Sequence, residues 1–153
     1  MERTMKQPRR YMSFDEELSR PSLELYGYAV LAIAGAEGEL GRGERESLID
    51  AGRSRGVDDA VLTSWQPADW QEVELEDTLV HLRNELSPPM RRLLIYDAIR
   101  AARADGVIAL QERKAIDDAA EILEVDAGTV KSLLALVELE ESANALRRSL
   151  LLL

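Results

Sequence analysis

The stretch at residues 96–126, YDAIRAARADGVIALQERKAIDDAAEILEVD, decides the fold. It predicts two helices joined by a tight turn at 104–108, because Gly106 readily takes the left-handed conformation that ends a helix. A related stretch at 28–58, YAVLAIAGAEGELGRGERESLIDAGRSRGVD, precedes it by 68 positions. The two share a tyrosine, an acid–glycine turn, a Glu-Arg pair and a Val-Asp ending. The chain is therefore predicted to contain a tandem helical repeat.

The composition also predicts an all-α protein. The chain is 46% hydrophobic but only 5% aromatic, and Ala and Leu, which favour helices, dominate over β-branched residues. No segment alternates polar and apolar residues with a period of two, so no sheet is expected. We predict a compact bundle of about seven to eight helices, formed by two helical repeats related by a pseudo-twofold axis.

The domain organisation follows from the repeat. Residues 1–20 are predicted to be a basic, polar tail, and residues 21–153 a single domain. Within it, repeat one spans about 22–64, a bridging segment spans 65–87, and repeat two spans about 88–141. Apolar spacing predicts helices over 22–36, 44–55, 60–64, 75–86, 88–104 and 110–123, a seventh from about 127, and a last short helix over 142–153.

Capping and aromatic residues refine these expectations. Ser22, Asp58 and Asp126 are expected to cap helix starts, and Ser87-Pro88-Pro89 is a strong start signal. Trp65 and Trp70 are expected to pin the inter-repeat segment to the bundle. The terminal leucines, 150–153, leave three roles open: completing the core, forming a dimer, or continuing into further sequence.

Charge and cysteine usage exclude several classes of function. The net charge is −10, which disfavours nonspecific binding to nucleic acid or to an anionic membrane and allows basic proteins or metal ions as partners. The chain has no cysteine, which fits a cytoplasmic protein. Its longest apolar run, 150–153, is far shorter than the ~20 residues of a membrane-spanning helix. We expect a cytoplasmic protein with a protein partner, and a homo-oligomer is left open.

The acids beside the two turns carry the functional prediction. Asp105 and Glu37 are expected at helix ends, where backbone carbonyls make a carboxylate unfavourable. Glu112 and Glu44 follow seven residues later, in the first turn of the next helix, where a carboxylate is favoured. Each turn can therefore bring two carboxylates toward one point.

The spacing of these acids matches the second half of an EF-hand loop, in which an acid, a glycine, an apolar residue and a later Glu recur. The first half of that loop is missing, because Ala101 and Arg103 stand where its leading acids belong. Two half-sites that face each other would suit a hard cation such as Ca²⁺ or Mg²⁺. The alternative is structural: the glycines turn the chain, Ile108 and Leu40 pack, and the glutamates cap.

The patterns AARADGVIALQER and, more weakly, AIAGAEGELGRGER resemble the TerB-like family, a helical domain associated with tellurite resistance. The resemblance covers about residues 22–140. It implies an all-α fold of two related helical units and a cytoplasmic, non-enzymatic stress-response or scaffold module. It also implicates Asp105, Glu112, Glu37 and Glu44 as ligands of a divalent cation. The first half departs from the pattern, with Glu37 in place of Asp and a flexible 41–43.

Three hypotheses follow. The first is a non-catalytic TerB-like module that binds a divalent cation or a partner protein at the acidic turns. The second is a metal-independent scaffold whose acidic surface docks a basic partner. The third, remote, is a hydrolase that uses paired carboxylates, although the chain has few aromatic side chains and His81 is its only histidine. We expect no enzyme activity.

Overall fold

The computed structural model describes residues 18–36, 42–65 and 74–151. These residues form helices and contain no strand, so the all-α prediction is confirmed. The helices are α1 (Arg20–Ala34), α2 (Arg42–Ser54), α3 (Asp59–Trp65), α4 (Leu75–Glu85), α5 (Pro88–Ala102), the 3-10 helix η2 (Arg103–Asp105), α6 (Leu110–Ile122) and α7 (Ala127–Leu151). None of the described helices is long and apolar enough to cross a membrane.

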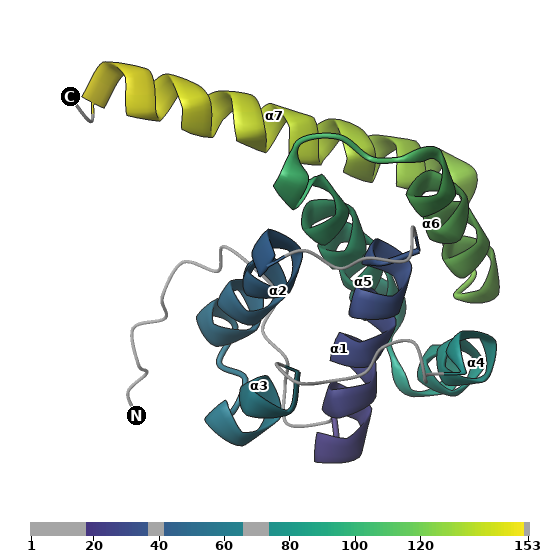
Figure 1. The fold of residues 1–153 in the computed structure, drawn as a ribbon. Coiled ribbons are helices and arrows are strands. Elements are labelled where there is room, and N and C mark those ends of the chain that lie inside the picture. Colours follow the sequence, from purple (N-terminus) through teal and green to yellow (C-terminus); the bar gives the residue numbers. More distant parts are fainter. Residues whose placement is uncertain (1–17, 37–41, 66–73, 152–153) are drawn as a thin grey trace, which may run out of the picture.

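Helix α1 lies at the centre of the bundle, against α2, α3, α4, α5 and α6 (Figure 1). Its side chains from Ala29 to Ala34 are all buried, so almost every face of this half of the helix meets a neighbour. The helix begins earlier than the sequence predicted. Ser19 is the cap, and its hydroxyl accepts the N–H of Ser22 at 3.2 Å. Ser22, the expected cap, is itself a buried residue in the first turn.

Trp65 directly follows the first repeat and packs in its interior. It ends α3 and is fully buried between α1 and α2, as expected of a residue that pins the inter-repeat segment. A Cβ added to Gly27 would lie 2.1 Å from its indole ring, and one added to Gly52 would lie 2.8 Å from it. Both glycines are therefore required for the close approach of the indole. Trp70 lies outside the described residues.

The ends of α2 and α6 have the same backbone geometry, as the repeat predicts. Gly56 and Glu124, which are 68 positions apart, both have positive φ, at 83° and 62°. Val57 and Val125 follow them and are equally buried. Glycine adopts this conformation without a steric penalty, whereas a residue with a Cβ does not. The second repeat therefore carries backbone strain that the first repeat avoids.

Helix α7 differs from its prediction. It is one continuous helix of 25 residues, and the separate short helix expected over 142–153 is wrong. No Gly or Pro occurs after Gly128, so nothing in the sequence ends the helix at residue 142. Asp126 does cap it as predicted, because its Oδ1 accepts the N–H of Thr129 at 2.8 Å. The helix crosses the top of the bundle and its C-terminal part projects beyond it (Figure 1).

Candidate functional site

Two of the four acids predicted as metal ligands are buried at equivalent places. Glu44 and Glu112 lie in the first turns of α2 and α6, and each is 3% exposed. Glu112 Oε1 accepts the backbone N–H of Ala109 at 2.9 Å. This bond satisfies an amide at the helix start and fixes one carboxylate oxygen. The structure thus gives Glu112 a capping role, which is the structural alternative raised by the sequence.

The other two acids predicted as metal ligands are Asp105 and Glu37. Asp105 ends η2 and is followed by Gly106 at φ +113°, whereas Glu37 lies outside the described residues. Among the residues that the structure describes, no group of three or more His, Cys, Asp or Glu side chains could hold a metal ion. The four-acid site therefore stays a prediction.

A buried ion pair that the sequence did not predict joins the two repeats. Arg55, just after α2, donates from Nη1 to Asp97 Oδ2 at 2.6 Å and from Nη2 to Oδ1 at 2.8 Å. The hydroxyl of Tyr26 donates to the same Oδ2 at 2.7 Å. Burial, followed by the nearby charge of Asp97, raises the pKa of Tyr26 well above its usual value. Burial alone would lower the pKa of Arg55, but the hydrogen bonds and charge of Asp97 raise it.

The sequence holds one local sign of this cluster, which is the position of Asp97. Asp97 stands between Tyr96 and Ala98 in a run of buried residues, where a lone carboxylate is costly unless it is paired. Comparison of the two repeats does not identify Arg55 as the partner of Asp97, because the equivalent positions are Leu123 and Ala29. The cluster lines none of the described hollows. It fastens α1, α2 and α5 together.

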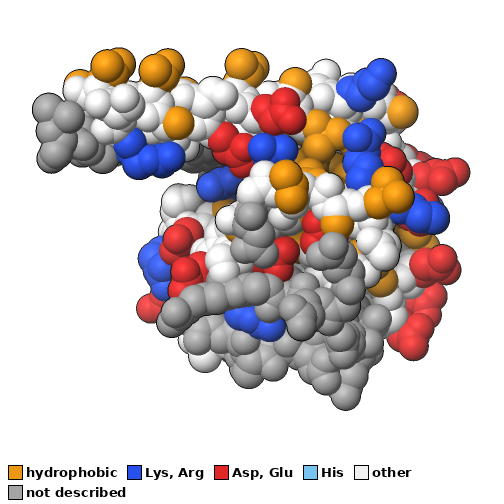
Figure 2. Space-filling model, turned by 45° about the horizontal axis from the view of Figure 1, so that its top comes forward, with side chains coloured by type: hydrophobic (Ala, Val, Ile, Leu, Met, Phe, Trp, Pro, Cys, Tyr) orange, Lys and Arg blue, Asp and Glu red, His pale blue; other side chains and the backbone are white. Residues whose placement is uncertain are grey.

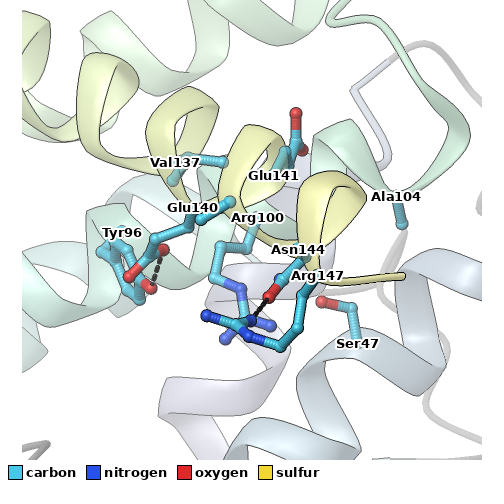
Figure 3. Close-up of a pocket in the computed structure, with 10 residues that line it drawn as sticks. Ser47, Tyr96, Arg100, Ala104, Val137, Glu140, Glu141, Asn144 and Arg147 are labelled. Atoms are coloured by element: carbon cyan, nitrogen blue, oxygen red, sulfur yellow. Dashed lines mark hydrogen bonds between the residues drawn. The ribbon is translucent and has the colours of Figure 1, made fainter. Parts of the chain in front are cut away.

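A polar hollow of about 420 Å³ lies beneath α7, between that helix, α2 and α5 (Figure 3). Two arginines and two glutamates line it. The hydroxyl of Tyr96 donates to Glu140 Oε1 at 2.6 Å, and the guanidinium of Arg100 lies 5.8 Å from the centre of the same tyrosine ring. Burial, with this hydrogen bond, raises the pKa of Tyr96.

A second contact beside the hollow also holds α7 in place, because Arg103 donates from Nε to Glu141 Oε1 at 3.0 Å. Within α7 itself, Arg147 donates to Asn144 Oδ1 at 2.5 Å (Figure 3). The charges lining the hollow balance, so it has no strong preference for an anion or a cation. These contacts orient α7 on α5 and leave its opposite face outward.

That opposite face is apolar and exposed. Leu139, Leu146 and Leu150 are each more than 60% exposed and Leu136 is 42% exposed. Figure 2 shows hydrophobic side chains along the outer edge of α7, away from the body of the molecule. Leu150 and Leu151 are exposed, so they do not complete the core. We call the surface formed by Leu136, Leu139, Ala143, Leu146 and Leu150 the outer face of α7.

A family model described as tellurite resistance protein TerB matches residues 28–135. The chain belongs to the TerB family. The match covers most of both repeats and confirms the resemblance drawn from the two turn motifs. The family is tellurite-resistance-associated, and the fold predicted from the repeats is its fold.

A solved structure agrees with this TerB assignment. The crystal structure of a tellurite resistance protein from Nostoc punctiforme matches with a TM-score of 0.70 and 26% sequence identity, over 90% of this chain and 84% of that chain. No curated protein matches the chain. In this TerB-family chain, the outer face of α7 carries leucines that are exposed over several turns.

Proposed function

We propose that this TerB-family chain is a non-catalytic, tellurite-resistance-associated module that binds a partner protein through the outer face of α7. The observation that carries the proposal is the exposure of every residue from 142 to 151, although this segment contains three leucines. Helix α7 buries only Val130 and Val137 against the body. A contiguous exposed apolar stripe on an ordered helix is typical of a protein-binding surface.

The chemistry of the interior supports a non-catalytic role. The buried polar cluster around Asp97 joins three segments, and its side chains bond to one another inside the bundle. In the hollow beneath α7, Tyr96, Glu140 and Glu141 make contacts that hold the helix. An enzyme needs a reactive group within hydrogen-bond reach of its substrate. The Asp97 cluster and the Tyr96–Glu140 pair instead make contacts that hold helices together.

Site-specific photo-crosslinking in the cell tests the docking surface. A photoreactive amino acid is placed at Leu146 in one strain and at Thr63, which is exposed on α3, in a matched control strain. We expect a covalent protein adduct from position 146 and none from position 63. Adducts that form equally at both positions, or at neither, would overturn the proposal.

A growth assay tests the cellular role. We expect loss of the chain to lower survival on potassium tellurite, and re-expression of the wild type to restore it. Leu139→Glu/Leu146→Glu, which changes only exposed side chains, should fold normally but fail to restore survival. Full restoration by this variant would show that the outer face of α7 does not serve the resistance function.

A second candidate is docking of a basic partner on the acidic start of α4, where Glu74, Glu76 and Asp77 are exposed. The net charge of −10 favours it. The two candidates differ in salt dependence, because charge-driven binding weakens steeply as salt rises whereas apolar docking does not. A captured partner that dissociates at about 0.5 M salt, and is lost in Glu76→Lys/Asp77→Lys, would favour the acidic surface.

A further inference from the structure

We propose that the outer face of α7 binds the same face of a second copy of this chain, with the two helices antiparallel. The inference rests on the proposed function, since it names the partner of that docking surface. Its first support is spacing. The outer-face residues stand at 136, 139, 143, 146 and 150, separated alternately by three and four residues. This is the spacing of the apolar seam between two paired helices.

Leu139 and Leu146, in the middle of the seam, face away from the body, while Ala143 also borders the hollow beneath α7. At 3.6 residues per turn, Leu146 is nine residues from the buried Val137 and therefore lies ~180° around the helix from it. Leu139 is two residues from Val137 and lies ~200° around. A second α7 laid on this seam would place its own body on the far side of the pair. The two bodies then avoid each other.

Charge complementarity selects a second copy and its direction. Glu140 and Arg147 each follow a seam leucine, Leu139 and Leu146, and so flank the same edge of the seam. When Ala143 lies opposite Leu146 of the second copy, antiparallel packing brings Glu140 next to Arg147 of the second copy. The twofold axis repeats the pair, so one alignment forms two opposite-charge contacts.

The same alignment fits the rest of the interface. Leu139 lies opposite Leu150 of the second copy, and Ser142 opposite Ser149, so no like charges meet along the other edge. In a parallel pair, Glu140 would instead face Ala135, and Arg147 would face Ser142. The small Ala143 near the centre allows close approach. Antiparallel helices also align their dipoles favourably.

The contacts on the body side leave this pairing possible. Glu140 uses Oε1 for the Tyr96 hydroxyl, and its second carboxylate oxygen can accept from an arginine. Arg147 donates to Asn144 from Nη1 and has further N–H groups. Glu140 and Arg147 both border the hollow beneath α7, so the proposed contact lies on the side of the seam that adjoins the hollow.

Sedimentation equilibrium on the full chain tests self-association. We expect a particle of twice the 17.1 kDa chain mass at about 100 μM. Leu146→Glu should weaken the dimer by at least about tenfold without lowering helicity, because Leu146 is exposed in one copy. A chain that stays monomeric at this concentration would overturn the inference.

Charge reversal tests the pairing itself. Glu140→Arg and Arg147→Glu should each weaken the dimer, and the double variant should restore it, since every contact is then reversed. Tyr96→Phe is the control for Glu140, because it removes the intrachain hydrogen bond and keeps the charge. Equal weakening by the double variant and by both singles would contradict the antiparallel contact.

A distance measurement tests direction. The chain has no cysteine, so Lys131→Cys gives a single spin-label site on an exposed position of α7. Antiparallel pairing places the two labels ~40 Å apart along the helices. A separation below about 25 Å would indicate parallel pairing and overturn the proposed alignment.

The outcomes also separate this inference from the proposed function. A crosslink from Leu146 to the same chain supports both. A crosslink to a different protein, combined with a monomer in sedimentation, leaves the docking function intact and overturns the second-copy assignment. An absence of any adduct from Leu146, combined with a monomer, overturns both.

Discussion

Arg55 and Asp97 form a two-point ion pair inside the bundle, with N–O distances of 2.6 and 2.8 Å and side chains that are 2% and 1% exposed. The pair links the end of α2, in the first repeat, to α5, in the second. Buried charges are stable only when they are paired and hydrogen-bonded. The contact between the repeats therefore depends on both partners being present.

Removing one partner of this pair should be costly. Asp97→Ala leaves the Arg55 guanidinium buried without its counter-charge and should lower the free energy of unfolding by about 3–5 kcal/mol. The double variant Arg55→Met/Asp97→Leu should recover part of this loss, because it removes the unpaired charge but also removes the Asp97 acceptor of the Tyr26 hydroxyl. Urea unfolding of the single and double variants measures the difference. A loss below about 1 kcal/mol for Asp97→Ala would show that the pair contributes little.

The close approach of Trp65 to α1 predicts that Gly27→Ala destabilises the fold. The added Cβ would lie 2.1 Å from the indole, and overpacking of this kind costs about 1–3 kcal/mol. In Trp65→Leu the same Gly27→Ala change should cost less, because the ring is gone. Gly128→Ala is the control, since its nearest neighbour would be 3.4 Å away. Thermal unfolding of the four variants checks the prediction.

The equivalent positions Gly56 and Glu124 should respond oppositely to substitution. Glu124→Gly removes the strain of a positive φ and should stabilise the chain by up to about 1 kcal/mol. The loss of the weak ion pair with Arg91, at 3.7 Å, should reduce this gain slightly. Gly56→Ala should destabilise it by about 1 kcal/mol, because it introduces the same strain. Chemical unfolding measures both changes. A destabilising Glu124→Gly would mean that the side chain matters more than the backbone.

Glu112 caps α6 in the structure and was predicted from the sequence to bind a metal, and the two roles predict different effects of substitution. Glu112→Gln keeps an acceptor for the N–H of Ala109 and should preserve most of the stability, whereas Glu112→Ala should lose about 1 kcal/mol. If the acids also hold a cation, Ca²⁺ or Mg²⁺ should release or absorb heat in calorimetry, and Asp105→Asn should abolish the signal. No heat and no change in melting temperature at millimolar metal would contradict the metal site.

Asp126 should make stability depend on pH. The backbone N–H of Thr129 stabilises its carboxylate and lowers the pKa of Asp126 below the usual value. The folded chain thus binds this proton less readily than the unfolded chain. The stabilisation is present above the unfolded pKa of about 3.9 and is lost as the pH falls through the lower folded pKa.

Asp126→Asn keeps an oxygen acceptor but does not titrate. The melting temperature of the wild type relative to this variant should be constant from about pH 8 to pH 5. It should decline below about pH 4. A difference in melting temperature between the wild type and Asp126→Asn that stays constant down to about pH 2 would contradict the prediction.

Local sequence signals predicted most of the helices, because each signal acts within a few residues. Ser87 and Asp126 cap α5 and α7 as expected, with hydroxyl and carboxylate oxygens accepting the N–H groups of Met90 and Thr129. Gly56 ends α2 with a positive φ. The start of α1 was misjudged because Ser19 and Ser22 are both compatible with a cap, and the break at residue 142 was misjudged because no Gly or Pro ends α7 there.

The sequence by itself determined the all-α class, the 68-residue repeat and the family, since these depend on periodicity and short-range turn chemistry. Only the tertiary structure decided which side chains meet. It brought Arg55 to Asp97 across 42 positions, turned Glu112 inward as a cap, and left the leucines on the outer face of α7 exposed. Burial and pairing depend on how helices pack in space, and no local pattern along the chain specifies that.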